Sequence, residues 1–170
     1  PRYVSMIAAV RKIAPQVTTL NIVLNEYSER VQELDDLPNV QQILPSENMR
    51  DTGKFYPQID GADFVLLVDD DIAFPNDLVE KMLVAAAKYG DGAIVGYHGT
   101  IYRIPRFSLK RRKFLKWLRF NPERDIIRNR KVLPFFKELQ QATRVHQLAT
   151  CVLMLPAALY PSFDTMRDSK

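Results

Sequence analysis

One stretch constrains the fold of this chain more than any other: the five apolar residues 64–68 lead directly into three aspartates at 69–71. An unbroken apolar run rich in Val and Leu is typical of a strand that is buried on both faces of a parallel sheet. In an open α/β sheet, ligands bind outside the carboxyl ends of such strands. We therefore expect the three aspartates to lie at a ligand-binding edge of the sheet.

The three carboxylates favour a bound cation. Adjacent carboxylates repel one another at neutral pH, and Mg²⁺ typically takes one or two protein carboxylates together with substrate phosphates. The alternative is that the aspartates cap the helix that follows them. Pro75, Asn76 and Asp77 already supply residues typical of a helix start, however. The sequence thus predicts a metal and phosphate site.

The rest of the chain alternates between extended and helical patterns, and its 170 residues suit one domain. We expect strands at 20–24, 40–44, 64–68, 93–97 and within 145–155, and helices at 2–14, 78–89, 109–120 and 134–141. Such alternation is typical of an α/β fold with a largely parallel sheet. A strand should precede the first helix in a doubly wound sheet, so we expect an upstream segment.

Charge is concentrated in one segment. Residues 103–131 hold twelve Lys or Arg and two acids, a local balance of +10 in a chain whose net charge is +4. Three interpretations stay open for this segment. It is a solvated surface helix, a helix on an anionic membrane surface with Trp117 inserted, or a binding site for an acidic polysaccharide or lipid-phosphate acceptor. Nucleic-acid binding is not expected, because no recognised binding module accompanies the charge.

The composition also bears on location. The lone Cys151 excludes an intramolecular disulfide and fits a reducing compartment. No apolar run approaches the ~20 residues that a membrane-spanning helix needs. We expect a cytoplasmic protein, peripheral to the inner face of the membrane if residues 103–131 bind lipid.

Three polar loops are expected to meet at one edge of the sheet, at residues 25–26, 51–54 and 69–71. Gly53 permits a turn close to a ligand, and Lys54 offers a point charge suited to a phosphate. Asn25 and Asp51 can hydrogen-bond a nucleobase or a ribose. The alternatives are that Lys54 is a solvated loop lysine and that Asn25 is an ordinary turn residue.

Together, these segments resemble a known family. Residues 51–56 (DTGKFY), 66–72 (LLVDDDI) with Pro75, and 98–99 (HG) are similar to segments of bacterial GT-A-fold glycosyltransferases of the inverting, family-two type, above all members that build capsule and cell-surface polysaccharide. The resemblance covers nearly the whole chain and is weakest at 103–140. It implies a GT-A-like, Rossmann-like α/β/α sandwich with a mostly parallel central sheet, here truncated at both ends, with 103–131 as an insertion.

The resemblance also implies the ligands and their residues. The donor would be a nucleotide-diphosphate sugar, UDP-sugar first of all, the acceptor a glycan or a lipid-linked hydroxyl, and the cofactor Mg²⁺ or Mn²⁺. Asp71 would hold the metal, and His146 would be a late metal ligand. The donor nucleotide would be bound by Asn25, Asp51, Lys54, Asp69 and Asp70.

The catalytic base that the resemblance implies is Asp168, with Asp164 as the alternative, and His98 would hydrogen-bond a sugar. Two features depart from the family pattern. The small-residue segment at 149–151 (ATC) lacks glycine, and the chain stops two residues after Asp168, before the helix that would support it.

Two other functions stay open. A phosphatase of the haloacid-dehalogenase type also places Asp-x-Asp after an apolar strand, but that motif opens its domain and is followed closely by Thr or Val. Here the motif follows 68 residues and precedes Ile72-Ala73-Phe74. The other alternative is a non-catalytic module on a truncated transferase fold, which uses the basic segment to hold an anionic ligand.

Overall fold

The computed structural model describes residues 2–90, 92–105, 107, 109–137 and 139–168, and it divides into two compact units. Unit 1 comprises Pro1–Val95 and Val152–Lys170, and unit 2 comprises Gly96–Cys151. Unit 1 is therefore built from two stretches of sequence that lie far apart in the chain. Along the described residues, no helix combines the length and the apolarity needed to cross a bilayer.

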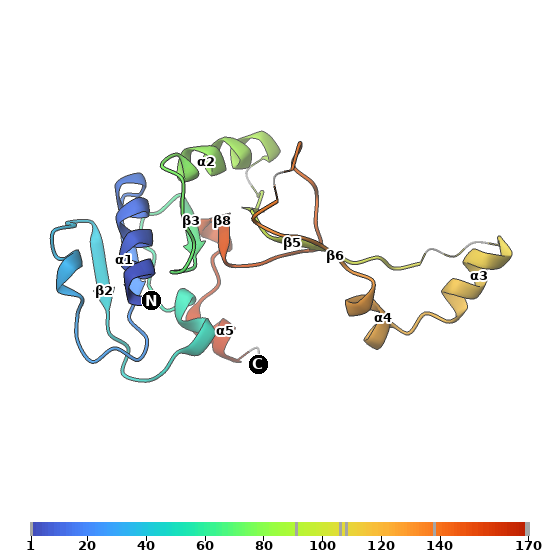
Figure 1. The fold of residues 1–170 in the computed structure, drawn as a ribbon, viewed down its shortest axis with the longest axis horizontal. Helices are drawn as coiled ribbons and strands as arrows, with labels where there is room; N and C mark the ends of the chain where they lie inside the picture. The colour runs from blue at the N-terminus through green and yellow to red at the C-terminus, as the bar shows by residue number, and fades with distance from the viewer. Residues whose placement is uncertain (1, 91, 106, 108, 138, 169–170) are drawn as a thin grey trace. The chain divides into compact units, whose positions relative to one another are not determined.

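Unit 1 contains two small sheets. The first pairs β1 (Leu20–Val23) with β2 (Val40–Ile43) in parallel, and Leu20 lies opposite Val40. The second has the order β3-β8-β4, with β3 (Phe64–Val68) antiparallel to β8 (Val152–Pro156) and β4 at Val95–Gly96. The last strand of the chain thus returns to lie beside the strand that carries the aspartates (Figure 1).

Unit 1 has two long α-helices and one short one. Helices α1 (Arg2–Ile13) and α2 (Leu78–Tyr89) have twelve residues each, and α5 (Phe163–Asp168) has six. The 3₁₀ helices are η1 (Ala14–Gln16), η2 (Gln32–Leu34), η3 (Arg50–Phe55) and η4 (Ala157–Leu159).

Helix α1 holds the two sheets of unit 1 together. Its buried Met6 and Val10 pack with Leu24 and Val40 on the β1–β2 side. Its other buried residues, Ala9 and Ile13, pack with side chains of β8 and α2, which include Met82 and Met154. Each large apolar side chain that is fully buried contributes roughly 1.5–3 kcal/mol of transfer free energy. The spacing of these four residues places them along one side of the helix, which explains why the sequence pattern predicted it correctly.

Unit 2 is a three-stranded antiparallel sheet that carries two exposed helices. The strand order is β6-β5-β7, from β5 (Gly99–Ile101), β6 (Lys131–Leu133) and β7 (Gln147–Leu148). The connection from β5 to β6 contains α3 (Arg111–Leu118) and α4 (Pro122–Arg128). Among the described residues of unit 2, only Gly99 and Leu133 are buried. A Cβ atom at Gly99 would lie 2.8 Å from Val145 Cγ1, so the sheet requires glycine there.

The α/β class is confirmed, but the sheets are small and only partly parallel. The expected strands at 20–24, 40–44 and 64–68 and the helices at 2–14 and 78–89 are present with bounds within one residue of those expected. The strand expected at 93–97 is only Val95–Gly96, with Gly99–Ile101 beyond it. The helix expected at 134–141 is wrong: its described residues form turns and bends, and the apolar side chains that suggested it, Phe135, Phe136 and Leu139, are exposed and so give no buried helical face.

The C-terminal segment packs against the η3 loop. The Tyr160 hydroxyl donates a hydrogen bond to the Lys54 carbonyl (3.0 Å) and lies 3.3 Å from the Pro57 carbonyl. The ring of Tyr160 is 5.9 Å from that of Phe55, and the rings of Tyr56 and Phe163 meet edge to face at 5.2 Å. This contact fixes the backbone of the loop that carries Lys54.

The first prediction concerns Tyr160, whose pKa is raised by burial from about 10 to about 12. Because the folded state keeps this proton when the unfolded state has lost it, the contribution to stability is complete below about pH 10 and is lost between pH 10 and 12. Tyr160→Phe should remove this part of the pH dependence. It should also cost about 1 kcal/mol at neutral pH through the lost hydrogen bond.

Urea denaturation of the wild type and the variant at a series of alkaline pH values provides the measurement. Tyr89→Phe, at the exposed end of α2, is the matched control and should leave the pH profile unchanged. Equal pH profiles for wild type and Tyr160→Phe would contradict the prediction.

Candidate functional site

The three aspartates follow β3 as expected. Asp69 ends the extended segment, and Asp70 and Asp71 form the turn after it. Asp69 and Asp70 are half-buried, whereas Asp71 is exposed. Within the described part of the chain, the Asp71 carboxylate has no hydrogen bond or ion pair, and Arg2 attracts it at longer range. Asp71 is thus the carboxylate of the three that is most open to a ligand.

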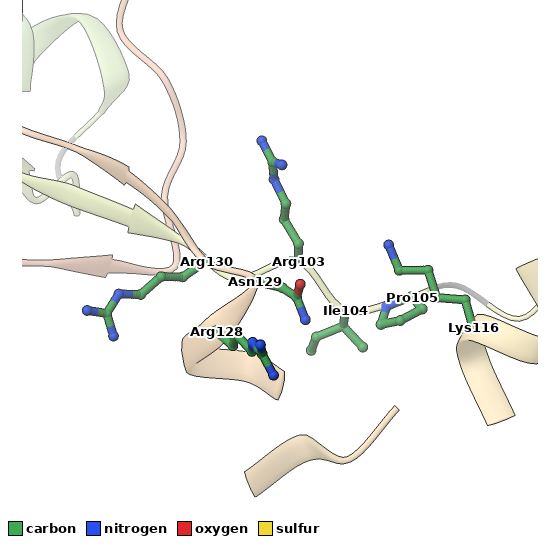
Figure 2. Close-up of a pocket in the computed structure, with 7 residues that line it drawn as sticks. All are labelled: Arg103, Ile104, Pro105, Lys116, Arg128, Asn129 and Arg130. Atoms are coloured by element: carbon green, nitrogen blue, oxygen red, sulfur yellow. The ribbon is translucent and has the colours of Figure 1, made fainter. Parts of the chain in front are cut away.

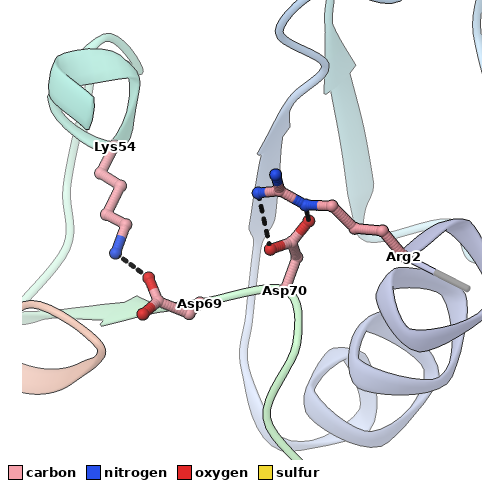
Figure 3. A network of polar contacts seen from close by, with 4 residues as sticks. All are labelled: Arg2, Lys54, Asp69 and Asp70. Atoms are coloured by element: carbon pink, nitrogen blue, oxygen red, sulfur yellow. Dashed lines mark hydrogen bonds and ion pairs between the residues drawn. The ribbon is translucent and has the colours of Figure 1, made fainter. Parts of the chain in front are cut away.

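Two cations from elsewhere in unit 1 pair with the other two aspartates (Figure 3). Lys54, at the end of η3, forms an ion pair with Asp69, and the two side chains are only 28% and 35% exposed. Arg2, the first residue of α1, makes a two-pronged contact with Asp70, with Nε 3.1 Å from Oδ2 and Nη2 3.2 Å from Oδ1. Hydrogen bonding to Asp70 raises the pKa of Arg2, so this guanidinium stays charged. Both pairs reduce the repulsion that the sequence predicts among the aspartates.

The loop after β1 joins the η3 loop through side-chain amides. Asn25 Nδ2 donates to Asn48 Oδ1 at 2.8 Å, and Asn25 Oδ1 accepts the Met49 amide N–H at 2.9 Å. Asn48 Nδ2 in turn donates to Glu26. The Asn25 contacts join the 25–26 loop to residues 48–49, just before η3, and the Lys54–Asp69 pair joins η3 to the 69–71 segment.

Two residues beside these contacts have left-handed backbone conformations. Glu26 has φ 66° and Arg50 has φ 48°. Among the described residues other than glycine, these two alone have positive φ. Such conformations cost of order 1 kcal/mol each for ordinary residues and gather at functional sites. Both residues flank the Asn25–Asn48 contact, so the left-handed backbone conformations of the described non-glycine residues are concentrated at this loop pair.

The η3 loop is held tightly at its centre. Thr52 is buried, and its Oγ1 donates to the Met49 carbonyl at 2.7 Å. A Cβ atom at Gly53 would lie 3.3 Å from Met49 Cβ and 3.6 Å from Val23 at the end of β1. Asp51 is exposed on the same turn. The sequence analysis interpreted Gly53 as a residue that permits a turn close to a ligand. In the structure, close packing against Met49 and Val23 also accounts for a glycine at this position.

A hollow of about 430 Å³ borders this region on the α1 side. It is lined by Tyr3 of α1 and by residues 26–33, which follow β1. Tyr3, one of these lining residues, follows Arg2, the partner of Asp70, in α1. The hollow offers aromatic and carboxylate groups near the start of that helix.

The residues present suit a metal that is only partly held by protein. Among the described residues, no three His, Cys, Asp or Glu side chains gather closely enough to form a metal site by themselves. Mg²⁺ commonly uses one or two carboxylates and takes its other oxygens from phosphates and water. Asp71 can supply such a ligand, with Asp69 beside it. The donor set is therefore chemically appropriate for a metal that arrives with a diphosphate.

The predicted histidines both lie in unit 2. His146 Nδ1 accepts a hydrogen bond from the Tyr102 amide at 3.1 Å, and the His146 amide donates to the Thr100 carbonyl at 2.9 Å. The neutral ring therefore carries its proton on Nε2. The His98 ring is half-buried, 6.4 Å from the ring of Phe135. The metal and sugar roles of these histidines stay predictions.

The two candidate bases lie on α5, in unit 1, and share one cation. Arg167 Nη2 is 3.1 Å from Asp164 Oδ1, and its Nε is 3.2 Å from Asp168 Oδ1. Hydrogen bonding to Asp168 and attraction to both aspartates raise the pKa of Arg167. Both carboxylates are largely exposed, so an acceptor hydroxyl can reach either of them.

Sequence analysis missed two residues of the site. Arg2 has the pattern of an ordinary exposed helical residue, and nothing local indicates that it pairs with Asp70, 68 positions away. Asn48 lies in a polar loop directly before the DTGK segment, which the sequence analysis did not consider. The position of that loop could have indicated Asn48, whereas no sequence pattern indicates the role of Arg2.

Compared with known proteins, the chain matches no protein-family model and no curated protein sequence. Its function is therefore a proposal that depends on its residues and their geometry.

The second prediction tests the Lys54–Asp69 pair. Lys54→Met should lower the free energy of unfolding by about 1 kcal/mol, because it leaves a half-buried carboxylate without its cation. Adding Asp69→Asn should recover most of that loss, since the remaining charge is then gone. Urea denaturation of the wild type, both single variants and the double variant gives the coupling energy.

Lys81→Met is the matched control, because it breaks the exposed Lys81–Asp77 pair on α2 (2.9 Å). It should change stability less than Lys54→Met does. Strictly additive effects of Lys54→Met and Asp69→Asn would show that the ion pair does not stabilise the fold.

Proposed function

We propose that this chain is a GT-A-like domain of a metal-dependent, inverting glycosyltransferase. The proposal depends chiefly on one observation: Lys54 from η3 and Arg2 from α1 gather around the carboxylates after β3, beside the linked Asn25 loop. A cluster of carboxylates and cations next to uncharged hydrogen-bonding groups suits a ligand with a diphosphate and a nucleoside. The resemblance of residues 51–56 and 66–72 to family-two transferases supports the same class.

The donor in this proposal is a nucleotide-diphosphate sugar, with UDP-sugar as the first candidate. Lys54 exchanges its contact with Asp69 for the diphosphate, and Asp69 becomes available to the ribose. Asn25, Asp51 and Asp70 complete the nucleotide site. Asp71 would hold Mg²⁺ or Mn²⁺, and the cation would supply positive charge for the leaving diphosphate.

The chemical step is a direct displacement at the anomeric carbon. The acceptor hydroxyl, on a glycan or a lipid-linked sugar, attacks from the face opposite the diphosphate, so that the configuration inverts. The new bond joins the acceptor oxygen to the anomeric carbon, and the bond from that carbon to the diphosphate oxygen breaks. Asp168 takes the acceptor proton, after releasing its contact with Arg167. Asp164 is the alternative base.

The third prediction tests the metal ligand. Asp71→Ala should abolish the Mn²⁺-dependent binding of uridine diphosphate, measured by titration calorimetry. It should leave the ligand-free fold at least as stable, because Asp71 is exposed and its removal relieves repulsion from the neighbouring aspartates. Glu80→Gln, which removes an exposed charge from the first turn of α2, is the matched control and should bind normally. Wild-type affinity in Asp71→Ala would remove the chemical basis of the proposal.

The fourth prediction tests the base. Asp168→Asn should lower the turnover of the sugar donor by at least about a hundredfold while the affinity for uridine diphosphate stays nearly unchanged, as expected for a group used only in the chemical step. Asp164→Asn is the matched comparison, since it removes the other partner of Arg167. Loss of turnover only in Asp164→Asn would transfer the role to that residue. Donor binding without turnover in the wild type would favour the non-catalytic module.

A further inference from the structure

Helix α3 of unit 2 is strongly two-sided and has no buried residue. At about 100° per residue, Phe114, Leu115, Trp117 and Leu118 occupy one side of the helix. Arg112, Lys113 and Lys116 occupy the other, whereas Arg111, in the first turn, lies on the apolar side. A two-sided helix of a globular protein normally packs its apolar side against a core. This one leaves all four apolar side chains exposed, Leu118 at 62%.

The apolar side continues beyond the helix. The rings of Phe107, Phe114 and Trp117 contact one another, with the Phe107 and Trp117 centroids 5.2 Å apart and nearly perpendicular. Leu109, two residues before the helix, is 87% exposed. Aromatic contacts order these side chains among themselves, yet their outer surfaces remain in water. The result is a continuous apolar surface that nothing described in unit 2 covers.

The charges on α3 do not serve the helix itself. Arg111, Arg112 and Lys113 lie in its first turn, where the positive end of the helix dipole disfavours cations. An isolated helix of eight residues is also too short to be stable in water. Both features oppose a free helix in solution, and both are relieved by an anionic partner that covers the apolar side.

Cations also line a hollow of about 350 Å³ between α3 and the end of α4 (Figure 2). Four of its lining residues are Arg103, Lys116, Arg128 and Arg130, and none of the described lining residues is acidic. Their charged ends point in different directions and not to one centre (Figure 2). Such a layout suits several anionic groups spread over a surface and not a single phosphate. Of the two acids in the segment, Asp125 is already paired with Arg124 at 2.9 Å.

We propose that residues 103–131, the basic arm, bind the surface of an anionic lipid bilayer. Helix α3 lies in the plane of the interface, with Trp117, Phe114 and Leu118 among the outer acyl chains and with Lys and Arg at the level of the headgroups. The anionic headgroups neutralise the hollow between α3 and α4. A soluble acidic polysaccharide would satisfy the charges as well, but it would leave the aromatic surface in water.

The fifth prediction uses Trp117 as its probe, because it is the chain's one tryptophan. On addition of phosphatidylcholine vesicles with about 30% phosphatidylglycerol, its emission should shift to the blue and become quenchable by brominated acyl chains. The chain should sediment with these vesicles and not with pure phosphatidylcholine. Raising the salt from about 0.1 M to about 1 M should release most of it, because the Debye length falls to about 3 Å.

Two sets of variants separate charge from insertion. Replacing Arg111, Arg112 and Lys113 by Gln should weaken partition into anionic vesicles about a hundredfold. The matched control replaces Arg30, Lys88 and Arg144, three cations outside the arm, and should stay within about twofold of wild type. Leu115→Gln with Leu118→Gln should weaken partition at least about tenfold. Val84→Gln, on the exposed side of α2, is its control and should have no effect.

Three results would overturn the proposal: unchanged Trp117 emission together with tight binding of soluble dextran sulfate, equal binding to neutral vesicles, or equal losses in the arm and control triple variants. The far-ultraviolet circular dichroism of each variant shows that unit 1 stays folded. The readout is lipid binding without donor or metal, so failure here leaves the proposed transferase function untouched, and the reverse also holds.

Discussion

The repulsion among three successive carboxylates is the constraint on which unit 1 depends. The strand β3 ends in residues 69–71, and two of these aspartates are half-buried. Lys54 and Arg2 oppose this charge from two different elements, so the ion pairs tie η3 and the start of α1 to the end of β3. Cations from two other elements thus reduce the repulsion among three neighbouring carboxylates on one segment. Asp71 lies exposed beside these pairs and is the most accessible of the three carboxylates.

The apolar packing explains how these elements reach one another. Helix α1 contacts the β1–β2 sheet through Met6 and Val10 and contacts β8 through the cluster that contains Ile13. This position brings Arg2, at its first turn, to Asp70. Tyr160 acts in the same way on the other side, because its hydrogen bond to the Lys54 carbonyl fixes the loop whose side chain meets Asp69. Packing made at a distance from the site therefore sets the site's geometry.

The two units differ in how their stability arises. Unit 1 has three clusters of buried apolar residues, built by helices and strands from both ends of the chain. In unit 2, the buried described residues are Gly99 and Leu133, and the apolar side of α3 is exposed. The exposed aromatic surface and the basic composition of residues 103–131 are the two observations on which the proposed binding to a bilayer depends.

The sequence by itself determined the elements with strong local patterns. The periods of α1 and α2 and the apolar run of β3 gave their bounds within about one residue, because burial acts on each position through its own side chain. It also located the aspartates at a strand end and the polar loops expected beside them. It failed at 134–141, where a few apolar residues suggested a helix that has no surface to pack against.

Only the tertiary structure decided the partners. Strand β3 pairs with β8, which follows it by more than eighty positions, and Arg2 meets Asp70 across 68 positions. Tyr160 reaches Lys54 across 106 positions. Local propensity carries no information about such contacts. They depend on the arrangement of several amphipathic elements around one core that gives the lowest total free energy. The carboxylates could therefore be named from the sequence, whereas the arginine that balances one of them, and the antiparallel neighbour of their strand, could not.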